Sequence, residues 1–499
     1  MGFLKSTVTV SFFTLLSRVF GFIRDVFFAK YLGAGLLSDV FLTSFKLPNF
    51  FRDIFAEGAF NAAFVPIFST QIVNTDKESV IKFSRNIFSL LLYSLLLITL
   101  VFEIFMPKVI TLIAAGFTNN PYKFKLTVTL SRIMFPYLIF ISLVSFMCGI
   151  LNSYGKFAVA SVNPIILNII FIVASILSVY LNKNIAFVLS YAVLIGGLIQ
   201  LLWLLFFTIK RGIILYPVYP RLDDITRKFL NNFSSGLVSC GIVQINSLVD
   251  SIIAARIPGA ISYLYYSERL MQLPVSLIGV ALSTAIMPLL SKKIEKKDSD
   301  TNETQENAIL FALFLGLPCA IGLGILSHSV ISTLFERGEF GAIASENVSR
   351  CLKIYSSAIP SFIVSKILQT IFYSGKDTRT PMIASFISLI TNIVFNLIFV
   401  RYYGFMGIVI SSIISSYINL IILLYILIKD RKLEFTTKFY VSFAKIIYVC
   451  IFMLMALLIC NKYIQLRTSL KLFLSIFVAG SLYLSISYGL KVVDFEKFL

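Results

Sequence analysis

The sequence is poor in the residues from which most enzyme and metal sites are built. It contains a single histidine, His328, and six cysteines with no C-x-x-C pair among them. We therefore expect neither a zinc or haem site nor a disulfide framework. No HExxH, P-loop or nucleophile–histidine pattern occurs, so the sequence predicts no catalytic residue, no metal and no resident cofactor.

Charge is also scarce. Only 13% of the 499 residues are charged, 58% are hydrophobic, and the mean hydropathy is +0.91. A soluble domain is roughly a quarter charged, so lipid must form part of the solvent around this chain. We expect most of the net charge of +19 to lie in cytoplasmic loops, where lysine and arginine are attracted to anionic lipid headgroups. Nucleic acid is not an expected partner.

Apolar runs long enough to cross a bilayer, about 20 residues, recur along the whole chain. They predict an all-α polytopic membrane protein with 14 transmembrane helices. Proline inside the longer runs predicts kinks at Pro48, Pro136, Pro274 and Pro360. The expected helices cover residues 6–31, 37–72, 84–106, 126–152, 158–181, 185–210, 230–256, 263–291, 306–327, 343–373, 380–401, 405–428, 437–461 and 467–490.

Basic residues gather in alternate loops, for example in 292–297 and 429–432. By the positive-inside rule these loops and both termini are expected on the cytoplasmic side. The charged stretch 212–228, which also contains proline, is expected to be an interfacial linker.

An internal repeat at a shift of roughly 220–226 residues predicts two six-helix lobes of the same topology. Five ordered matches carry it, among them Asp25 with Asp250, Leu47-Pro48 with Leu273-Pro274 and Pro136 with Pro360. Two such bundles around a central site are a transporter plan that permits alternating access. The expected parts are an N-lobe at 1–211, the linker at 212–228, a C-lobe at 229–430 and two additional helices at 431–499.

Four arginines, Arg18, Arg24, Arg52 and Arg269, lie inside apolar segments. An arginine at bilayer depth costs about 2.5–3.5 kcal/mol, so these side chains must face a watery cavity or one another. The planar guanidinium donates two parallel hydrogen bonds and favours a phosphate group. Ion pairing within the membrane is the alternative, and the pairs it predicts are Arg24 with Asp25, Arg52 with Asp53 or Glu57, and Arg269 with Glu268.

At this point the sequence resembles a known family. The strings SRVFGFIRD (17–25), SDVFLTSFKLPNFFRDIFAEGAFNAAFVP (38–66), RIMFPYLIFISL (132–143) and ERLMQLP (268–274) resemble the MurJ/MviN family of bacterial lipid II flippases. That family belongs to the multidrug/oligosaccharidyl-lipid/polysaccharide exporter superfamily. The resemblance covers essentially the whole chain, including two helices beyond a twelve-helix core.

The resemblance implies a substrate, a cavity and a place. The substrate would be lipid II, an undecaprenyl-pyrophosphate-linked disaccharide-pentapeptide, moved from the inner to the outer leaflet of the bacterial cytoplasmic (inner) membrane. Arg18, Arg24, Arg52 and Arg269 match the family's cavity arginines, and Asp25, Asp39 and Glu57 match its cavity acids. The last two helices would form a groove for the polyprenyl tail. Asp53 departs from the pattern, because the family often has a second basic residue there.

Some family members hold a monovalent cation between helices 7, 11 and 12. Asp250, Asn392 and Asn396 are the matching candidates here, and interhelical hydrogen bonding is the alternative role for the two asparagines. Na⁺ or the membrane potential would then bias the transport cycle. Membrane lipids and the peptidoglycan synthesis machinery are the other expected partners.

Other functions stay open at this level. A polyprenyl-linked polysaccharide flippase or a cation-coupled drug exporter of the same superfamily would share the fold. A membrane-embedded glycan polymerase would need catalytic motifs that the sequence lacks. A scaffold that transports nothing would not need buried arginines.

Overall fold

The structure is a computed structural model that describes residues 2–54, 60–296, 298, 300–464 and 466–492. Helices make up 87% of the described residues, and the described ranges contain no strand. The predicted all-α class is confirmed.

The chain forms two compact units. Unit 1 comprises Met1–Ser262 and Arg337–Phe340, and unit 2 comprises Tyr263–Glu336 and Gly341–Leu499. The predicted lobes rest on a repeat in the sequence, which this division does not address, so their boundaries stay a prediction.

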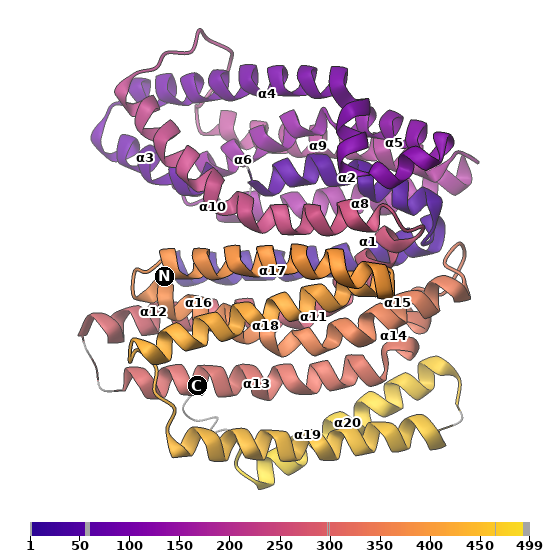
Figure 1. The fold of residues 1–499 in the computed structure, drawn as a ribbon. Helices are drawn as coiled ribbons and strands as arrows, with labels where there is room; N and C mark the ends of the chain where they lie inside the picture. The colour runs from indigo at the N-terminus through magenta and orange to yellow at the C-terminus, as the bar shows by residue number, and fades with distance from the viewer. Residues whose placement is uncertain (1, 55–59, 297, 299, 465, 493–499) are drawn as a thin grey trace. The chain divides into compact units, whose positions relative to one another are not determined.

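Most helices of unit 1 follow one another through short connections, and a longer segment joins α9 to α10 (Figure 1). Their bounds are α1 (Gly2–Leu32), α2 (Leu36–Ile54), α3 (Phe60–Asn74), α4 (Lys77–Ile113), the 3₁₀ helix η2 (Ala115–Asn119), α5 (Pro121–Met134), α6 (Tyr137–Ser153), α7 (Phe157–Ser161), α8 (Asn163–Tyr180), α9 (Ile185–Lys210) and α10 (Asp224–Ala254).

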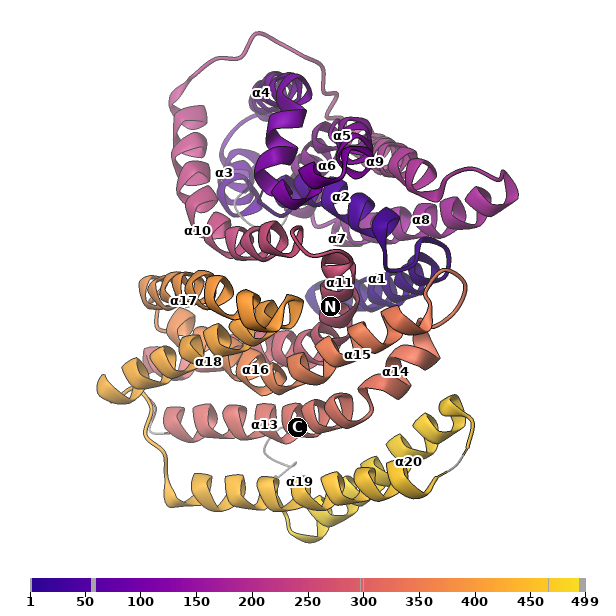
Figure 2. The ribbon, with the colours of Figure 1, turned by 45° about the vertical axis from the view of Figure 1, so that its right-hand side comes forward.

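α11 begins in unit 1 and continues into unit 2, where α19 and α20 pack beside α13 and α14 (Figures 1 and 2). The bounds are α11 (Ala260–Pro274), the π-helix η3 (Val275–Val280), α12 (Ala281–Lys296), α13 (Thr301–Ile325), α14 (Ser327–Leu334), α15 (Ala342–Tyr355), the 3₁₀ helix η4 (Ser356–Ala358), α16 (Ile359–Ser374), α17 (Arg379–Tyr403), α18 (Phe405–Lys429), α19 (Thr437–Tyr463) and α20 (Thr468–Gly489).

Eleven segments of the described part are long and apolar enough to cross a membrane. The expected spans 6–31, 37–72 and 230–256 are not among them, and all three include side chains that the structure does not describe. The chain is a multi-pass membrane protein, and the exact count of 14 is not confirmed.

Helix ends follow local chemistry as well as hydropathy. The expected helix 185–210 coincides with α9, whereas α4 begins seven residues before the expected 84 and ends seven residues after the expected 106. The early start follows from capping, because the Asp76 carboxylate accepts hydrogen bonds from the backbone N–H groups of Glu78 (3.1 Å) and Ser79 (3.3 Å).

Proline interrupts the helical ladder at three of the four expected positions. Pro136 separates α5 from α6, Pro274 directly precedes the π-helix, and Pro360 opens α16 after a 3₁₀ turn. Pro48 instead lies inside α2, which continues through it to Ile54.

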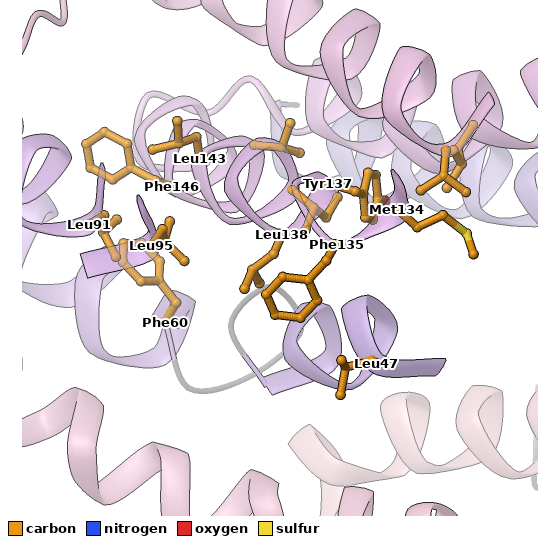
Figure 3. Close-up of a cluster of buried hydrophobic side chains, with 14 of the residues drawn as sticks. Leu47, Phe60, Leu91, Leu95, Met134, Phe135, Tyr137, Leu138, Leu143 and Phe146 are labelled. Carbon is orange, nitrogen blue, oxygen red and sulfur yellow. The ribbon is translucent and has the colours of Figure 1, made fainter. Parts of the chain in front are cut away.

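The core of unit 1 combines phenylalanine with leucine, methionine and other apolar side chains (Figure 3). Phe64 stacks on Phe68 with ring centroids 5.0 Å apart and meets Phe146 edge to face at 5.2 Å. Phe60 packs on the same ring of Phe146 and on Phe229 of α10. Lipid tails are as apolar as these rings, so close packing rather than escape from water holds α3, α6 and α10 together.

The expected interfacial linker is an extended strap, residues 213–223, fastened to α4. Asn86 donates to the Arg221 carbonyl (2.6 Å) and accepts from the Arg221 N–H (2.7 Å), and Ser89 Oγ accepts from the Val218 N–H (2.7 Å). The Arg85 guanidinium lies 3.9 Å from the centre of the Tyr216 ring. These contacts tie the start of α10 to the body of unit 1.

Candidate functional site

The Arg24 guanidinium in α1 is held from three directions. Its Nη2 and Nε donate to Asp25 Oδ1 at 2.8 and 3.1 Å, and its Nη1 donates to Asn168 Oδ1 of α8 at 3.0 Å. The ring centroids of Phe28 and Phe171 lie 5.6 and 5.9 Å away, within cation–π range. The side chains of Arg24 and Asp25 are 14% and 5% exposed, so the charge pair is largely withdrawn from its surroundings.

α8 supplies the neutral partner of this pair. Asn168 Nδ2 donates to the Ser17 carbonyl oxygen at 3.2 Å, which fixes the amide with its oxygen toward Arg24. Asn168 is itself buried. The amide orients the guanidinium and adds no charge of its own, while the charge of Arg24 is balanced by Asp25.

Arg18 precedes Arg24 by six residues on α1 and is partly exposed. Among the described residues it forms no recorded hydrogen bond or ion pair. The predicted role of Arg18 in the cavity therefore rests on its place in α1 and is not tested by a contact.

Arg52 lies in the last turn of α2 and forms an ion pair with the next residue, Asp53. Its Nη2 and Nε donate to Asp53 Oδ1 at 2.8 and 3.2 Å, and the two side chains are 31% and 21% exposed. This is one of the two partners that the sequence suggested. The other, Glu57, lies outside the described residues, so its predicted role as a cavity acid stays a prediction.

The carboxylate of Asp39 in α2 accepts four hydrogen bonds. The donors are Lys123 Nζ (2.9 Å), the Gly259 N–H (2.9 Å), the Ser262 N–H (3.1 Å) and Ser262 Oγ (2.7 Å). The ammonium of Lys123 also lies 3.9 Å from the centre of the Phe117 ring. The Asp39 side chain is 1% exposed, so within unit 1 this acid joins α2, α5 and the start of α11.

The sequence did not reveal this contact, because Lys123 lies before the expected helix 126–152. The lysine is buried, 84 residues away from its acid along the chain. Nothing in the sequence indicates which acid this lysine meets.

Arg269 belongs to unit 2 and is exposed on α11. Its guanidinium carbon lies 4.9 Å from the centre of the Tyr265 ring, one helical turn earlier. Glu268, the ion-pair partner suggested by the sequence, accepts a hydrogen bond from Gln272 Nε2 at 2.7 Å. Pro274 and the π-helix follow directly, and π-helical segments often occur at functional sites.

Lys366 of α16 is a candidate that the sequence analysis missed. It lies in the candidate span Ala342–Ser374. Its aliphatic stem packs so closely on Gly279 of the π-helix that a Cβ atom added to this glycine would stand 3.2 Å from Lys366 Cδ. No ion pair or hydrogen bond from its ammonium is recorded among the described residues. A cation within a span is a functional-site candidate by default, and one lysine between apolar residues was the signal.

The three candidate cation ligands belong to different units. Asp250 lies on α10 in unit 1, whereas Asn392 and Asn396 lie buried on α17 in unit 2. Asn396 Nδ2 donates to Asn392 Oδ1 at 2.8 Å, and Asn392 Nδ2 donates to Ser412 Oγ of α18 at 3.4 Å. The first bond lies within α17 and the second joins α17 to α18, and the cation site stays a prediction.

Comparison with known families gives one consistent match. The model of a family described as lipid II flippase MurJ matches residues 28–479. A protein of Rickettsia prowazekii (strain Madrid E) named probable lipid II flippase MurJ is 34% identical over 100% of this chain and 99% of its own length. A protein of the same name from Rhizobium meliloti (strain 1021) is 37% identical over 85% of this chain and 80% of its own length.

Solved structures give the same result at the level of the fold. A structure described as lipid II flippase MurJ in an inward closed conformation matches with a TM-score of 0.83 and 28% identity, over 96% of this chain and 98% of its own. An inward-facing multidrug resistance transporter of the MATE family matches with a TM-score of 0.69 and 16% identity, over 84% of this chain and 96% of its own. At that identity the second match bears on the fold alone.

Proposed function

Because the chain belongs to the MurJ family of lipid II flippases, we propose that it carries lipid II from the inner to the outer leaflet of the bacterial cytoplasmic membrane. The chain is a transporter and not an enzyme. On this proposal both termini lie in the cytoplasm, which follows from the lysine-rich loops.

The observation that carries the proposal is the Arg24 guanidinium, which is paired with Asp25 and oriented by the neutral amide of Asn168. Asp25 and Asn168 fix its orientation, and two aromatic rings flank it. A pyrophosphate can take over donors of this guanidinium, since a diphosphate offers several acceptor oxygens in the plane of the fork.

The remaining basic residues are proposed to provide further contacts with the headgroup. Arg18 and Arg52 in unit 1 and Arg269 in unit 2 are proposed to contact the same headgroup at successive stages of the cycle, with Asp25 and Glu57 as exchangeable counter-charges. Lys366 adds a compact cation in unit 2.

The tail of the substrate is proposed to stay in lipid along α19 and α20. α19 joins the rest of unit 2 through Glu306 of α13, whose carboxylate accepts from the backbone N–H and the Oγ1 of Thr436. α20 is joined through the Tyr483 hydroxyl, which donates to the Phe314 carbonyl at 2.6 Å. Both helices otherwise present apolar side chains to their surroundings. The energy source is proposed to be Na⁺ or the membrane potential, worth about 2.3 kcal/mol per charge per 100 mV.

Complementation of a bacterial strain depleted of its own lipid II flippase tests this function. The wild-type chain is expected to restore growth, and Arg24→Ala and Arg269→Ala are expected to fail at equal abundance in the membrane. Purified protein should bind lipid II in preference to cationic dyes. Preferential binding of the dyes, with growth restored by both alanine variants, would support a drug exporter instead.

A further inference from the structure

A polar cavity of about 490 Å³ lies in unit 2, lined by residues where α13 passes into α14 and where α19 is followed by α20. Figures 1 and 2 show where these helix ends lie. Its volume is in the range of small-ligand sites. It is lined by Ile325, His328, Ser329, Asn461, Lys462, Ile464, Leu466, Thr468 and Lys471.

Positive charge dominates this lining. Lys462 and Lys471 are cationic and His328 can become so, and none of the nine lining residues is acidic. The carboxylate recorded closest to His328 belongs to Glu346, with Oε2 4.0 Å from the imidazole Nε2. That carboxylate also accepts from Arg350 Nε at 2.7 Å, so it is shared with another cation. The cavity thus concentrates a field that attracts anions.

Hydrogen-bond donors are fixed in place around the cavity. Lys471 Nζ donates to the Asn461 carbonyl oxygen at 2.7 Å, which ties the first turn of α20 to the end of α19. Arg467 at the N-cap of α20 provides no side-chain cap, and Thr468 of the uncapped first turn lines the cavity. Backbone N–H groups there lack helical partners and suit an anionic oxygen.

Apolar surface continues from the cavity along both helices. Large hydrophobic side chains are exposed on the adjoining turns of α19 and α20, among them Ile451, Met455, Leu458, Ile459, Leu470, Phe473, Leu474 and Phe477. A ligand with an anionic group in the cavity would lay an attached hydrocarbon chain on this surface. The arrangement fits an amphiphile better than a small soluble anion.

The cavity lies at the end of unit 2 opposite to the basic loops. α13 begins just after the lysine-rich stretch 292–297 and α19 just after 429–432, and both helices run from there to the cavity. If the basic loops are cytoplasmic, the cavity opens at the outer leaflet.

We propose that this cavity binds the phosphate group of an anionic lipid in the outer leaflet. His328, Lys462 and the first turn of α20 hold the phosphate, and Lys471 holds the shape of the rim. The site uses none of the cations assigned to lipid II transport, but its apolar surface lies on α19 and α20, along which the tail of lipid II is also proposed to lie.

The test measures lipid binding to the purified full-length protein in detergent by native mass spectrometry. Dioleoylphosphatidylglycerol, a long-chain polyprenyl phosphate and soluble glycerol 3-phosphate are titrated separately. Lys462→Gln and His328→Gln are expected to weaken binding of both lipids about fivefold each, the scale of losing a partly exposed charge contact. Lys438→Gln, at the other end of α19, removes the same charge and is expected to leave binding unchanged.

Two results would overturn the proposal. Equal lipid binding by wild type, Lys462→Gln and His328→Gln would place the phosphate elsewhere. Glycerol 3-phosphate that binds as tightly as the lipids would make the ligand a soluble phosphate. Preference for either lipid over the other supports the site and identifies which phosphate it takes.

Discussion

Two buried ion pairs in unit 1 each join a basic residue to an aspartate, and they differ in their other hydrogen-bond partners. Arg24–Asp25 and Lys123–Asp39 each place a cation within 2.9 Å of an acid that is 5% exposed or less. Asp39 receives three further hydrogen bonds from the start of α11, so the acid is saturated. Arg24 is the centre of its own group, and its second partner is the neutral amide of Asn168.

The difference indicates which buried charge stabilises the fold and which is available for chemistry. An acid saturated by main-chain and hydroxyl donors has no capacity left for a ligand, and its loss leaves buried donors unpaired. A guanidinium oriented by a neutral amide can exchange one partner for a phosphate oxygen while the helix stays intact. The predictions below test this distinction, beginning with the largest expected effect.

Asp39→Asn should have the largest effect, because it unfolds or destabilises unit 1. Asparagine keeps one acceptor but leaves the Lys123 ammonium buried without its counter-charge, at about 3–5 kcal/mol. The folded fraction, measured by size-exclusion chromatography of the detergent extract, should fall sharply. Asp39→Asn combined with Lys123→Met should recover part of it. A fully folded single variant would show that the Asp39–Lys123 pair is not structural.

Arg24→Gln should abolish transport; because it also leaves the buried Asp25 without its counter-charge, binding and transport are compared at equal amounts of folded protein. The loss of a charge-assisted contact with phosphate, about 2–3 kcal/mol, corresponds to ~30–150-fold weaker binding of lipid II. Arg24→Lys keeps the charge but lacks the planar fork, and it should recover only part of the binding. Binding to the three proteins by native mass spectrometry gives the order. Full recovery by lysine would show that the fork is not needed.

Lys366→Met should have a smaller effect, which raises stability and lowers transport. Methionine removes an intramembrane cation and keeps the length of the chain against the π-helix, so resistance to thermal unfolding should rise. Transport of lipid II should fall about tenfold, if the ammonium contributes one contact of about 1.4 kcal/mol. A stabilised protein with unchanged transport would remove Lys366 from the substrate path.

Arg132→Gln should have the smallest effect. Its Nε donates to the Glu103 carbonyl oxygen at 3.2 Å, and the guanidinium is exposed on α5. An exposed contact of this kind is worth about 0–1 kcal/mol, so growth and transport should remain at the wild-type level. A clear transport defect in this variant would show that position in a span, and not its surroundings, determines an arginine's importance.

The sequence was informative wherever one local signal decides the structure. Apolar runs located the helices, and proline marked the breaks before α6, α16 and the π-helix. The Arg24–Asp25 and Arg52–Asp53 pairs were also foreseeable, because neighbours in sequence meet regardless of the tertiary fold.

Contacts between distant helices were not foreseeable. Asn168 approaches Arg24 across 144 residues, and Lys123 reaches Asp39 across 84. A single sequence gives no register between helices, so the composition of α8 and α5 could not identify these partners. Lys366 was overlooked for a related reason, since its depth depends on how α16 packs on the π-helix.

Reconstitution of the purified protein in liposomes, with labelled lipid II and an impermeant probe outside, tests the central claim most directly. The account predicts that the wild type makes lipid II from the inner leaflet accessible to the probe. Arg24→Ala, folded to the same extent, should leave it protected. Translocation by Arg24→Ala at the wild-type rate would contradict the claim that this guanidinium binds the headgroup.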